Sequence, residues 1–336
     1  MAKRSESEYI FADSYVGSNV ARLMTTRDVM RVATSPDLES ASVILREFGY
    51  DDDKYLHEGF IEPFIRREQR ELYEEVFSVL PDRKELEFNL YPYDYNNLKV
   101  CLKAEQMGVV PDQLTNLMST ASIPPAVIVA LVRDRNYDRM PPTMQRGVKE
   151  AIDAFARSKD PQVIDLILDR TCYLHMLEQA RESEDDFLIE YVKMLIDAVN
   201  LSAFLRLRNL GKSWNFLKEI FIDGGHITSQ MLIASFEEPA SRVAEKVEPY
   251  GFGKAVAEGG KVLKETGSIA TWEKLRDDAI MHYLKTAKFE SFGVHPIQAY
   301  LCAKETEIDN LRVALSGVLF GFTPAEVEER LKESYV

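Results

Sequence analysis

Carboxylates are the residue type in this chain that would first suggest metal-dependent chemistry. They cluster in "DDDK", "ESEDD" and "RDD", which begin at Asp51, Glu182 and Arg276. A magnesium-dependent helical enzyme needs paired carboxylates one helical turn apart on facing helices, as in a DDxxD pattern. None of the three clusters has that spacing. We interpret the first two as solvent-exposed loops and predict no metal site.

The remaining chemical motifs also fail to match a catalytic pattern. The five histidines lack HExxH spacing, and the chain has no GxSxG nucleophile elbow. "LGKS", Leu210 to Ser213, resembles the end of a phosphate-binding loop but lacks the required earlier glycine. "GFGKAVAEGG", Gly251 to Gly260, has no βαβ pattern around it and is predicted to be a loop with a capping glycine. The sequence therefore predicts no catalytic residue, no cofactor and no small-molecule substrate.

The charge and hydropathy of the chain limit its partners. Its 336 residues include 41 Lys plus Arg and 55 Asp plus Glu, a formal net charge of −14. This balance argues against nucleic acid and against an anionic membrane surface. Three widely spaced cysteines predict no disulfide framework. The longest apolar run, near Ile123 to Val132, is too short to span a bilayer. We therefore expect a soluble protein.

The hydrophobic pattern is helical almost throughout. Apolar residues recur at spacings of three and four, and alternating strand patterns are scarce. Proline and glycine clusters, such as "SIPPA" and "RMPPT", have the composition of turns between helices. The predicted fold class is all-α.

One pattern occurs three times along the chain. Each copy has an asparagine-leucine pair, a second leucine four residues further on, and a glycine six residues after that leucine. An acidic residue stands three positions before each asparagine. Three copies at similar intervals indicate internal repetition. The copies are Asp94, Asn97, Leu98, Leu102, Gly108; Asp197, Asn200, Leu201, Leu205, Gly211; and Glu307, Asn310, Leu311, Leu315, Gly321.

The spacing within each copy predicts a helix with a buried apolar stripe. Ile308, Leu311 and Leu315 share one face in the third copy, as do Tyr95, Leu98, Leu102 and Ala198, Leu201, Leu205 in the others. The acid and the asparagine lie one turn apart beside this stripe. We predict that each pair is structural and fixes its helix to a neighbouring segment of the same unit.

The glycine of each copy is predicted to end its helix. After Gly321, Thr323, Pro324 and Glu326 have the spacing of a capping box that starts a new helix. Ser213 stands at the capping position of the second copy. The chain thus divides into three helical units of about a hundred residues each, with predicted boundaries 10–125, 126–235 and 236–336.

Two segments carry a family resemblance. "HPIQAYLCAKETEIDNLRVALSG" near the C-terminus and "DPQVIDLILDR", Asp160 to Arg170, together with the threefold acid-x-x-Asn-Leu pattern, resemble the C subunit of bacterial and archaeal V-type or A-type ATPases. The eukaryotic counterpart in that family is the d subunit. The resemblance covers essentially the whole chain.

The resemblance implies a fold and a function. Members of this family resemble a funnel of three similar helical domains around a pseudo-threefold axis. They are non-catalytic central-stalk rotor subunits that couple a rotating shaft to the membrane ring during ATP-driven proton or sodium transport or ATP synthesis. The implied partners are the central shaft subunits and the rotor ring. The implied location is the cytoplasmic face of a membrane, with membrane contact only through the ring. The alternative is a free-standing scaffold built from helical repeats.

Turns that follow the repeat helices are candidate contacts with such a ring. They include Ile123 and Pro124 after the first copy and Gly225 and Ile227 after the second. Exposed apolar turns could rest on a partner. The competing interpretation, which we slightly prefer, is that they are buried connections between helices.

Overall fold

A computed structural model describes residues 6–51, 54–109, 114, 117–290 and 292–336 of the chain. These described residues form 17 α-helices and no strand, so the predicted all-α class is confirmed. The chain groups into two compact units. Of the described residues, unit 1 contains those in Lys84–Leu207 and Lys212–Ala234, and unit 2 contains those up to Arg83 together with Arg208–Gly211 and Ser235–Val336.

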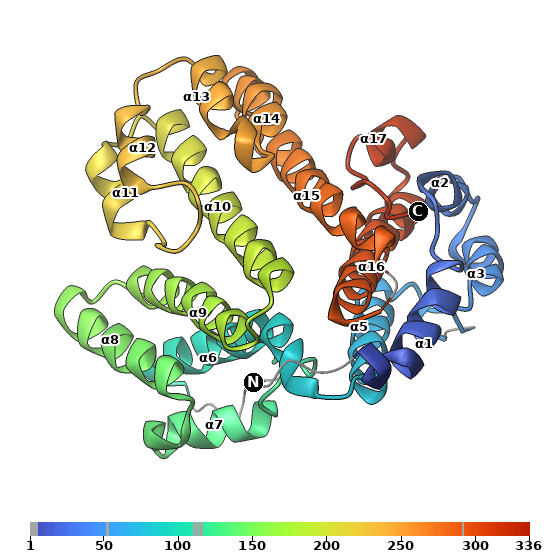
Figure 1. Ribbon diagram of the computed structural model, residues 1–336, viewed down its shortest axis with the longest axis horizontal. Helices are drawn as coiled ribbons and strands as arrows, with labels where there is room; N and C mark the ends of the chain where they lie inside the picture. Colours follow the sequence, from blue (N-terminus) through green and yellow to red (C-terminus); the bar gives the residue numbers. More distant parts are fainter. Residues whose placement is uncertain (1–5, 52–53, 110–113, 115–116, 291) are drawn as a thin grey trace. The chain divides into compact units, whose positions relative to one another are not determined.

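Unit 1 is built around helix α9, which packs against both α6 and α8 (Figure 1). Pro125 and Pro142 stand in the first turns of α7 and α8, where a missing N–H costs nothing and a fixed φ favours the helix. Gly147 allows α8 and α9 to approach, because a Cβ there would lie 2.5 Å from Thr171 Oγ1. The helices of unit 1 are α6 (Tyr91–Gln106), α7 (Pro125–Arg133), α8 (Pro142–Ser158), α9 (Gln162–Glu182), α10 (Asp186–Asn209), α11 (Trp214–Ile220) and α12 (Ser229–Ala234).

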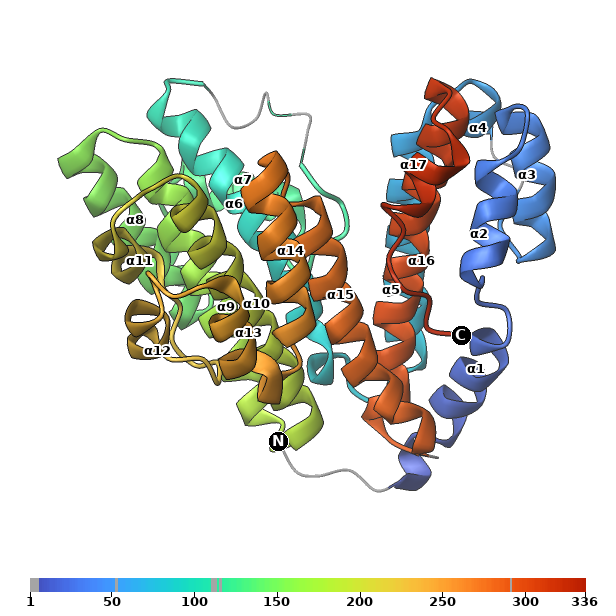
Figure 2. The ribbon, with the colours of Figure 1, turned by 90° about the horizontal axis from the view of Figure 1, so that it is seen from above.

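Unit 2 is centred on its longest helix, α16, which packs extensively against α2 and α5; Figure 2 shows α5 and α16 side by side. In a second set of contacts, α14 packs against α13 and α15. Its helices are α1 (Ile10–Val20), α2 (Thr26–Ala33), α3 (Leu38–Glu47), α4 (Lys54–His57), α5 (Ile61–Val79), α13 (Ala240–Val247), α14 (Gly253–Thr266), α15 (Ala270–Leu284), α16 (Val294–Phe320) and α17 (Pro324–Glu328).

The N-terminal helices join the C-terminal part of the chain within unit 2. Helix α5 buries Phe64 and Ile65 completely, and α16 is its main partner. Burying such apolar faces is the dominant favourable term in packing helices together. The contacts therefore unite residues up to 83 with residues 235–336. The three repeat boundaries drawn from the sequence, and their arrangement as a funnel, stay predictions.

The glycine-rich stretch from Gly251 to Gly260 corrects one expectation. Only its beginning is a turn, with Gly251 in the left-handed region, and the rest forms most of α14. Gly259 shows why glycine occurs inside this helix. A Cβ at this position would lie 2.5 Å from the Cα of Trp272, a fully buried residue of α15. The glycine serves close helix packing, which a loop interpretation of the sequence missed.

Within the described part of the chain, no helix combines the length and the apolar character that crossing a bilayer requires.

Candidate functional site

The asparagine of each repeat binds the backbone of a segment that follows its own helix. The side-chain amide nitrogen donates to a backbone carbonyl, and the backbone N–H of the same residue donates to the side-chain oxygen. The bound residue lies 21 or 22 positions after the asparagine in every copy. The pairs are Asn97 with Met118 (2.9 and 2.7 Å), Asn200 with Ile222 (2.8 and 2.9 Å) and Asn310 with Lys332 (3.0 and 2.9 Å).

Both hydrogen bonds of each pair are buried or nearly so. The three asparagines are at most 2% exposed. A buried amide without partners would cost about 1 to 3 kcal/mol, whereas one that satisfies a backbone donor and acceptor stabilises the packed state. Each asparagine thus ties a motif helix to the chain that returns after it. We call these three helices, α6, α10 and α16, the anchored helices.

The acid of each repeat makes a second attachment. In unit 1, both acids bind a turn that lies about 28 to 30 residues further along the chain. Asp94 accepts from the backbone N–H of Ile123 at 3.0 Å and from the Ser122 hydroxyl. Asp197 accepts from the N–H groups of His226 and Ile227 at 3.0 and 2.9 Å. The bound segments begin 28 and 29 residues after the acid. Two attachments per copy hold the whole turn against the anchored helix.

His226 completes the second copy with a bridge between two carboxylates. Its Nδ1 lies 3.1 Å from Asp197 Oδ2, and its Nε2 lies 2.7 Å from Glu190 Oε2. Gly225 lies so close to Asp197 that a Cβ would overlap the carboxylate. This contact requires glycine at position 225.

The acid of the third repeat binds a different part of the chain. Glu307 accepts from the backbone N–H of Met24 at 2.5 Å and from the Tyr50 hydroxyl at 2.6 Å. Lys304 donates to the same carboxylate at 2.5 Å, and its ammonium lies 4.2 Å from the centre of the Tyr50 ring. The third anchored helix therefore fixes the start of α2 and the end of α3, which are more than 250 residues away in sequence.

Burial changes the acidity of these groups. It raises the pKa of Asp94 to about 6, against the lowering effect of the Ser122 and Ile123 hydrogen bonds. Burial also raises the pKa of Asp197, opposed by hydrogen bonds from Ile227 and His226. Burial raises the pKa of Tyr50 well above its usual range, and the Glu307 charge adds to this.

A buried histidine lies beside the first anchored helix. His175 of α9 stacks on Tyr91 at 4.2 Å between ring centres, and its Nδ1 lies 3.3 Å from the Tyr95 hydroxyl. Burial lowers the pKa of His175 to about 4. At neutral pH the imidazole is therefore uncharged and acts as a packed aromatic ring with one polar partner.

The predicted apolar stripes and helix ends are confirmed. All nine stripe residues are at most 4% exposed. Gly108, Gly211 and Gly321 have φ of 74°, 62° and 71°, the left-handed conformation in which glycine is favoured. Thr323 and Glu326 form the expected capping box of α17, and Ser213 caps α11 through the N–H of Asn215.

The candidate ring-contact turns differ in accessibility. Pro124 is exposed, and Ile123 and Gly225 are half-buried. The side chain of Ile227 is 2% exposed, so it packs inside unit 1. The attachments to Asp94 and Asp197 fix the shape of both turns. Their contact with a ring stays a prediction.

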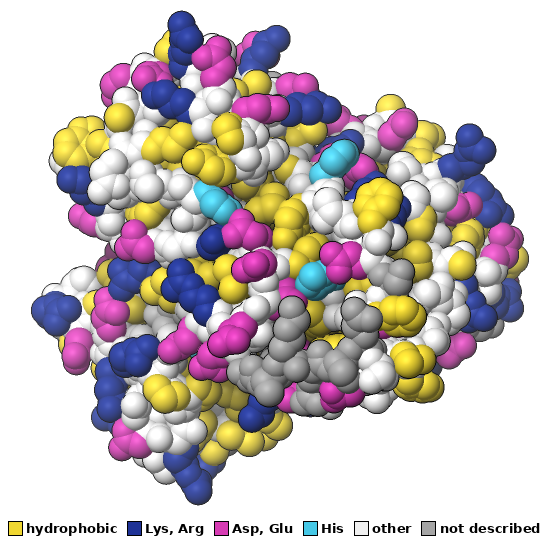
Figure 3. Space-filling model, viewed as in Figure 1, with side chains coloured by type: hydrophobic (Ala, Val, Ile, Leu, Met, Phe, Trp, Pro, Cys, Tyr) yellow, Lys and Arg dark blue, Asp and Glu magenta, His cyan; other side chains and the backbone are white. Residues whose placement is uncertain are grey.

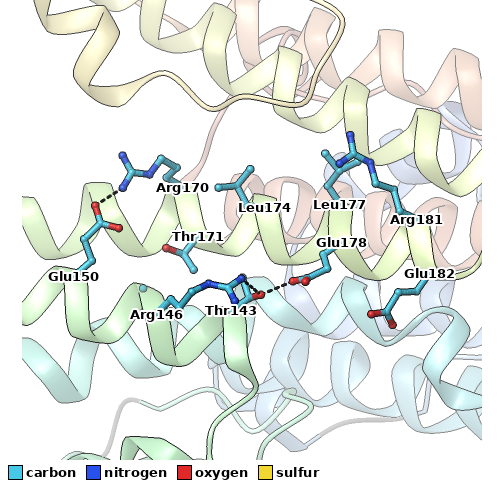
Figure 4. A pocket seen from close by; sticks show the side chains of 11 residues that line it. Thr143, Arg146, Glu150, Arg170, Thr171, Leu174, Leu177, Glu178, Arg181 and Glu182 are labelled. Carbon is cyan, nitrogen blue, oxygen red and sulfur yellow. Dashed lines mark hydrogen bonds and ion pairs between the residues drawn. The ribbon is translucent and has the colours of Figure 1, made fainter.

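A groove of about 680 Å³ lies between α8 and α9 in unit 1 (Figure 4). Leu174, Leu177 and Thr171 line it from α9, and Arg170 pairs with Glu150 across it at 2.5 Å. Side chains of both charge signs alternate over this region in the space-filling view (Figure 3). Within the groove the Thr143 hydroxyl donates to the Glu178 carboxylate and accepts from Arg146. The described residues that line the groove include no cluster of metal ligands.

The acidic clusters singled out in the sequence can be followed only where the structure describes them. In the described part of the chain, no group of three or more His, Cys, Asp or Glu side chains could hold a metal ion. Asp52 and Asp53 lie outside the described residues. Asp277 pairs with Lys332 at 3.0 Å, and Asp278 accepts from the backbone N–H of Glu333 at 2.6 Å. These last two carboxylates fix the segment that Asn310 also binds.

The partners of the anchored helices were not evident from the sequence. Met118, Ile222 and Lys332 contribute only backbone groups to the asparagines, so their side-chain types carry no signal. Their common distance from each asparagine becomes meaningful only once the contacts are known. Tyr50 and Met24 are more remote still and belong to no repeated pattern.

Comparisons with known proteins agree on one family. The family model described as ATP synthase (C/AC39) subunit matches residues 16–330. The C subunit of the A-type ATP synthase of Methanothermobacter thermautotrophicus is 24% identical, over 96% of this chain and 87% of that protein. The C subunit of the V-type sodium ATPase of Enterococcus hirae is 23% identical, over 98% and 99% of the two chains. The C subunit of another A-type ATP synthase, from Methanosphaera stadtmanae, is 22% identical over 91% and 82%.

Proposed function

Because this chain belongs to the ATP synthase (C/AC39) subunit family, we propose that it is a non-catalytic part of the central stalk of a rotary ATPase. In this role it couples a rotating shaft to a membrane ring that transports protons or sodium ions. The proposal includes two partners, the shaft subunits and the rotor ring, and a position on the cytoplasmic face of the membrane. It requires no cofactor and no small-molecule substrate.

The observation that carries the proposal is the match over nearly the full chain. Relatives named as the C subunits of A-type ATP synthases and of a V-type sodium ATPase align with almost all of it. A resemblance confined to one helix would support only a shared fold element. A match over both compact units favours a shared role in the complex.

The anchored helices support the proposed role in passing torque from the shaft to the ring. A protein that passes torque must resist local unfolding, and buried hydrogen-bonded attachments raise the free energy of local opening. Each anchored helix is bound to its following segment by two asparagine hydrogen bonds, and to a second segment by its acid. Three such helices give stiff bodies through which a rotation is transmitted with little loss.

The acidic charge suggests how the shaft is attracted. A net charge of −14 favours a basic partner and would speed its docking at low ionic strength. We expect the affinity for the shaft to fall as salt rises. Equal affinity at low and high salt would contradict this part of the proposal.

Co-purification tests the role directly. The tagged chain is expressed with the shaft subunits and the membrane sector, and the complex is extracted in mild detergent. We expect both shaft and ring to remain bound. Omitting the chain is expected to leave ATP hydrolysis intact but to separate it from ion pumping. A chain that purifies alone, and whose absence changes neither activity, would favour the second candidate, a free-standing helical scaffold.

A further inference from the structure

One segment at the end of α10 has a charge opposite to that of the chain as a whole. The residues from Arg206 to Lys218 include four Lys and Arg and no Asp or Glu, although the net charge of the chain is −14. The segment continues into the start of α11. A local concentration of positive charge of this kind indicates a surface for an anionic partner.

The same segment exposes aromatic side chains. Residues 212–216 are all exposed, with Trp214 at 38% and Phe216 at 44%. The ammonium of Lys218 lies 4.7 Å from the centre of the Trp214 ring. Arg206 and Lys218 are exposed as well. We call Arg206, Lys212, Trp214, Phe216 and Lys218 the basic-aromatic tip.

The tip is held in position by the second anchored helix. Ser213 caps the first turn of α11, and Leu217 is fully buried beneath it. Two residues after α11 ends, Ile222 is bound by Asn200 through two hydrogen bonds. Hydrophobic and basic side chains adjoin at the edge of the face where Figure 1 places α11 (Figure 3). The exposed side chains therefore stand on a fixed support.

We propose that the basic-aromatic tip binds the headgroup region of an anionic phospholipid bilayer. Lysine and arginine are attracted to anionic headgroups, and tryptophan favours the boundary between water and hydrocarbon. The acidic remainder of the chain does not prevent this, because salt screens charges over about 8 Å at physiological ionic strength. An acidic protein segment would satisfy the cations but leave the exposed Trp214 and Phe216 without a matching apolar phase.

This contact goes beyond the proposed function, and it replaces the expectation from the sequence that the chain meets the membrane only through the ring. It concerns the isolated chain and does not depend on any ATPase partner. A failure of the lipid experiment would leave the co-purification test unaffected, and the reverse also holds.

Tryptophan fluorescence tests the contact, because the chain has two tryptophans in different surroundings. Trp214 is 38% exposed and Trp272 is fully buried in unit 2. The full chain is mixed with vesicles of phosphatidylcholine containing phosphatidylglycerol, with and without bromine on the acyl chains. We expect bromine to quench part of the emission. The Trp214→Phe variant is expected to lose this quenching, whereas unaltered quenching in that variant would overturn the proposal.

Charge variants provide the matched control. In a vesicle flotation assay, the double variant K212Q/K218Q is expected to bind more weakly by roughly fivefold for each cation removed. The variant K261Q/K264Q removes the same charge from exposed positions of α14 and is expected to bind like the original chain. High salt and vesicles of phosphatidylcholine alone are expected to abolish binding.

Two outcomes would contradict the lipid assignment. One is equal binding of the two double variants to anionic vesicles. The other is an absence of bromine quenching combined with a loss of ring retention in detergent by K212Q/K218Q alone. In that second case the tip binds an acidic segment of a protein and not the lipid.

Discussion

Asp197 in the second anchored helix and Glu307 in the third stand at the same position, three residues before a buried asparagine, but they bind very different segments. Asp197 holds a turn 29 and 30 residues further along the chain. Glu307 holds Met24 and Tyr50, at separations of 283 and 257 residues. The asparagines, in contrast, bind the same kind of segment in every copy.

The difference shows which part of the repeat is local. The asparagine attachment closes a short loop within one copy, so its geometry repeats with the sequence. The acid attachment depends on which backbone N–H groups the fold brings to it. The longer side chain of Glu307 reaches a network with a hydroxyl and an ammonium, where Asp197 meets two adjacent N–H groups and an imidazole. The third copy thereby ties the beginning of the chain to its end.

The largest effect is expected from Glu307→Ala. It leaves the Met24 N–H, the Tyr50 hydroxyl and the partly buried Lys304 ammonium without their acceptor. Removing one partner of such a group costs about 3 to 5 kcal/mol. Hydrogen exchange is expected to accelerate in α2 and α3 and to change little in α14.

Asp197→Ala is the matched variant for that comparison. It frees two backbone N–H groups, but His226 keeps its contact with Glu190, so we expect a smaller cost of about 2 kcal/mol. The faster exchange should be confined to the turn around residues 223–227. If Asp197→Ala lowered the free energy of unfolding as much as Glu307→Ala or more, the long-range attachment of Glu307 would not be the costlier one to break.

The three asparagines are expected to respond alike. Asn97→Ala, Asn200→Ala and Asn310→Ala each remove two hydrogen bonds to one backbone residue, at about 2 to 3 kcal/mol. The two compact units need not unfold together, so a single free energy of unfolding for the whole chain is not well defined. The measurement is therefore local hydrogen exchange at the segment that each asparagine binds. Asn209→Ala, at an exposed position of α10, is expected to change stability by less than about 0.5 kcal/mol. Intact stability with lost shaft binding in Asn310→Ala would contradict a structural role.

Asp94 is expected to make stability depend on pH. Its folded pKa of about 6 lies above the ordinary value, so its stabilising contribution is present below pH 4 and is lost as pH rises through 6. The loss is about 2 to 3 kcal/mol. In Asp94→Asn this contribution should disappear and only the opposite contribution of His175 should remain, which urea unfolding at pH 4, 5, 6 and 7 would show.

His175 is expected to give stability the opposite pH dependence, over nearly the same range of pH. Its folded pKa of about 4 lies below the ordinary value, so its contribution is present above pH 6.5 and is lost as pH falls towards 4. The two effects partly cancel in the original chain. The difference between the pH profile of the original chain and that of Asp94→Asn therefore isolates the contribution of Asp94. Identical profiles would show that the Asp94 carboxyl does not titrate in this range.

The smallest effect is expected at the helix ends. Gly321→Ala places a Cβ at φ of 71° with no atom within 4 Å, so the cost is backbone strain alone, about 1 kcal/mol. Gly17 of α1 also has open space but an ordinary helical backbone, so Gly17→Ala is expected to stabilise by up to about 1 kcal/mol. The unfolding temperature should fall in Gly321→Ala and rise in Gly17→Ala. A shift in the same direction for both variants would contradict the prediction.

The sequence was informative wherever side-chain type and spacing carry the signal. The nine stripe residues follow helical spacing, because a helix that packs on one face must repeat its apolar residues every three or four positions. The Thr323 capping box and the left-handed glycines follow from equally local rules. The stretch from Gly251 to Gly260 misled, because composition alone does not distinguish a loop glycine from one that lets two helices approach.

The sequence by itself determined the all-α class, the threefold motif and the ends of its helices, since these depend on interactions within a few turns of chain. Tertiary structure alone decided what the motif binds. The partners are backbone groups of Met118, Ile222 and Lys332, and every residue type except proline offers the same N–H and C=O. The attachment of Glu307 to Met24 and Tyr50 was equally hidden, because it exists only after α16 has packed against the N-terminal helices.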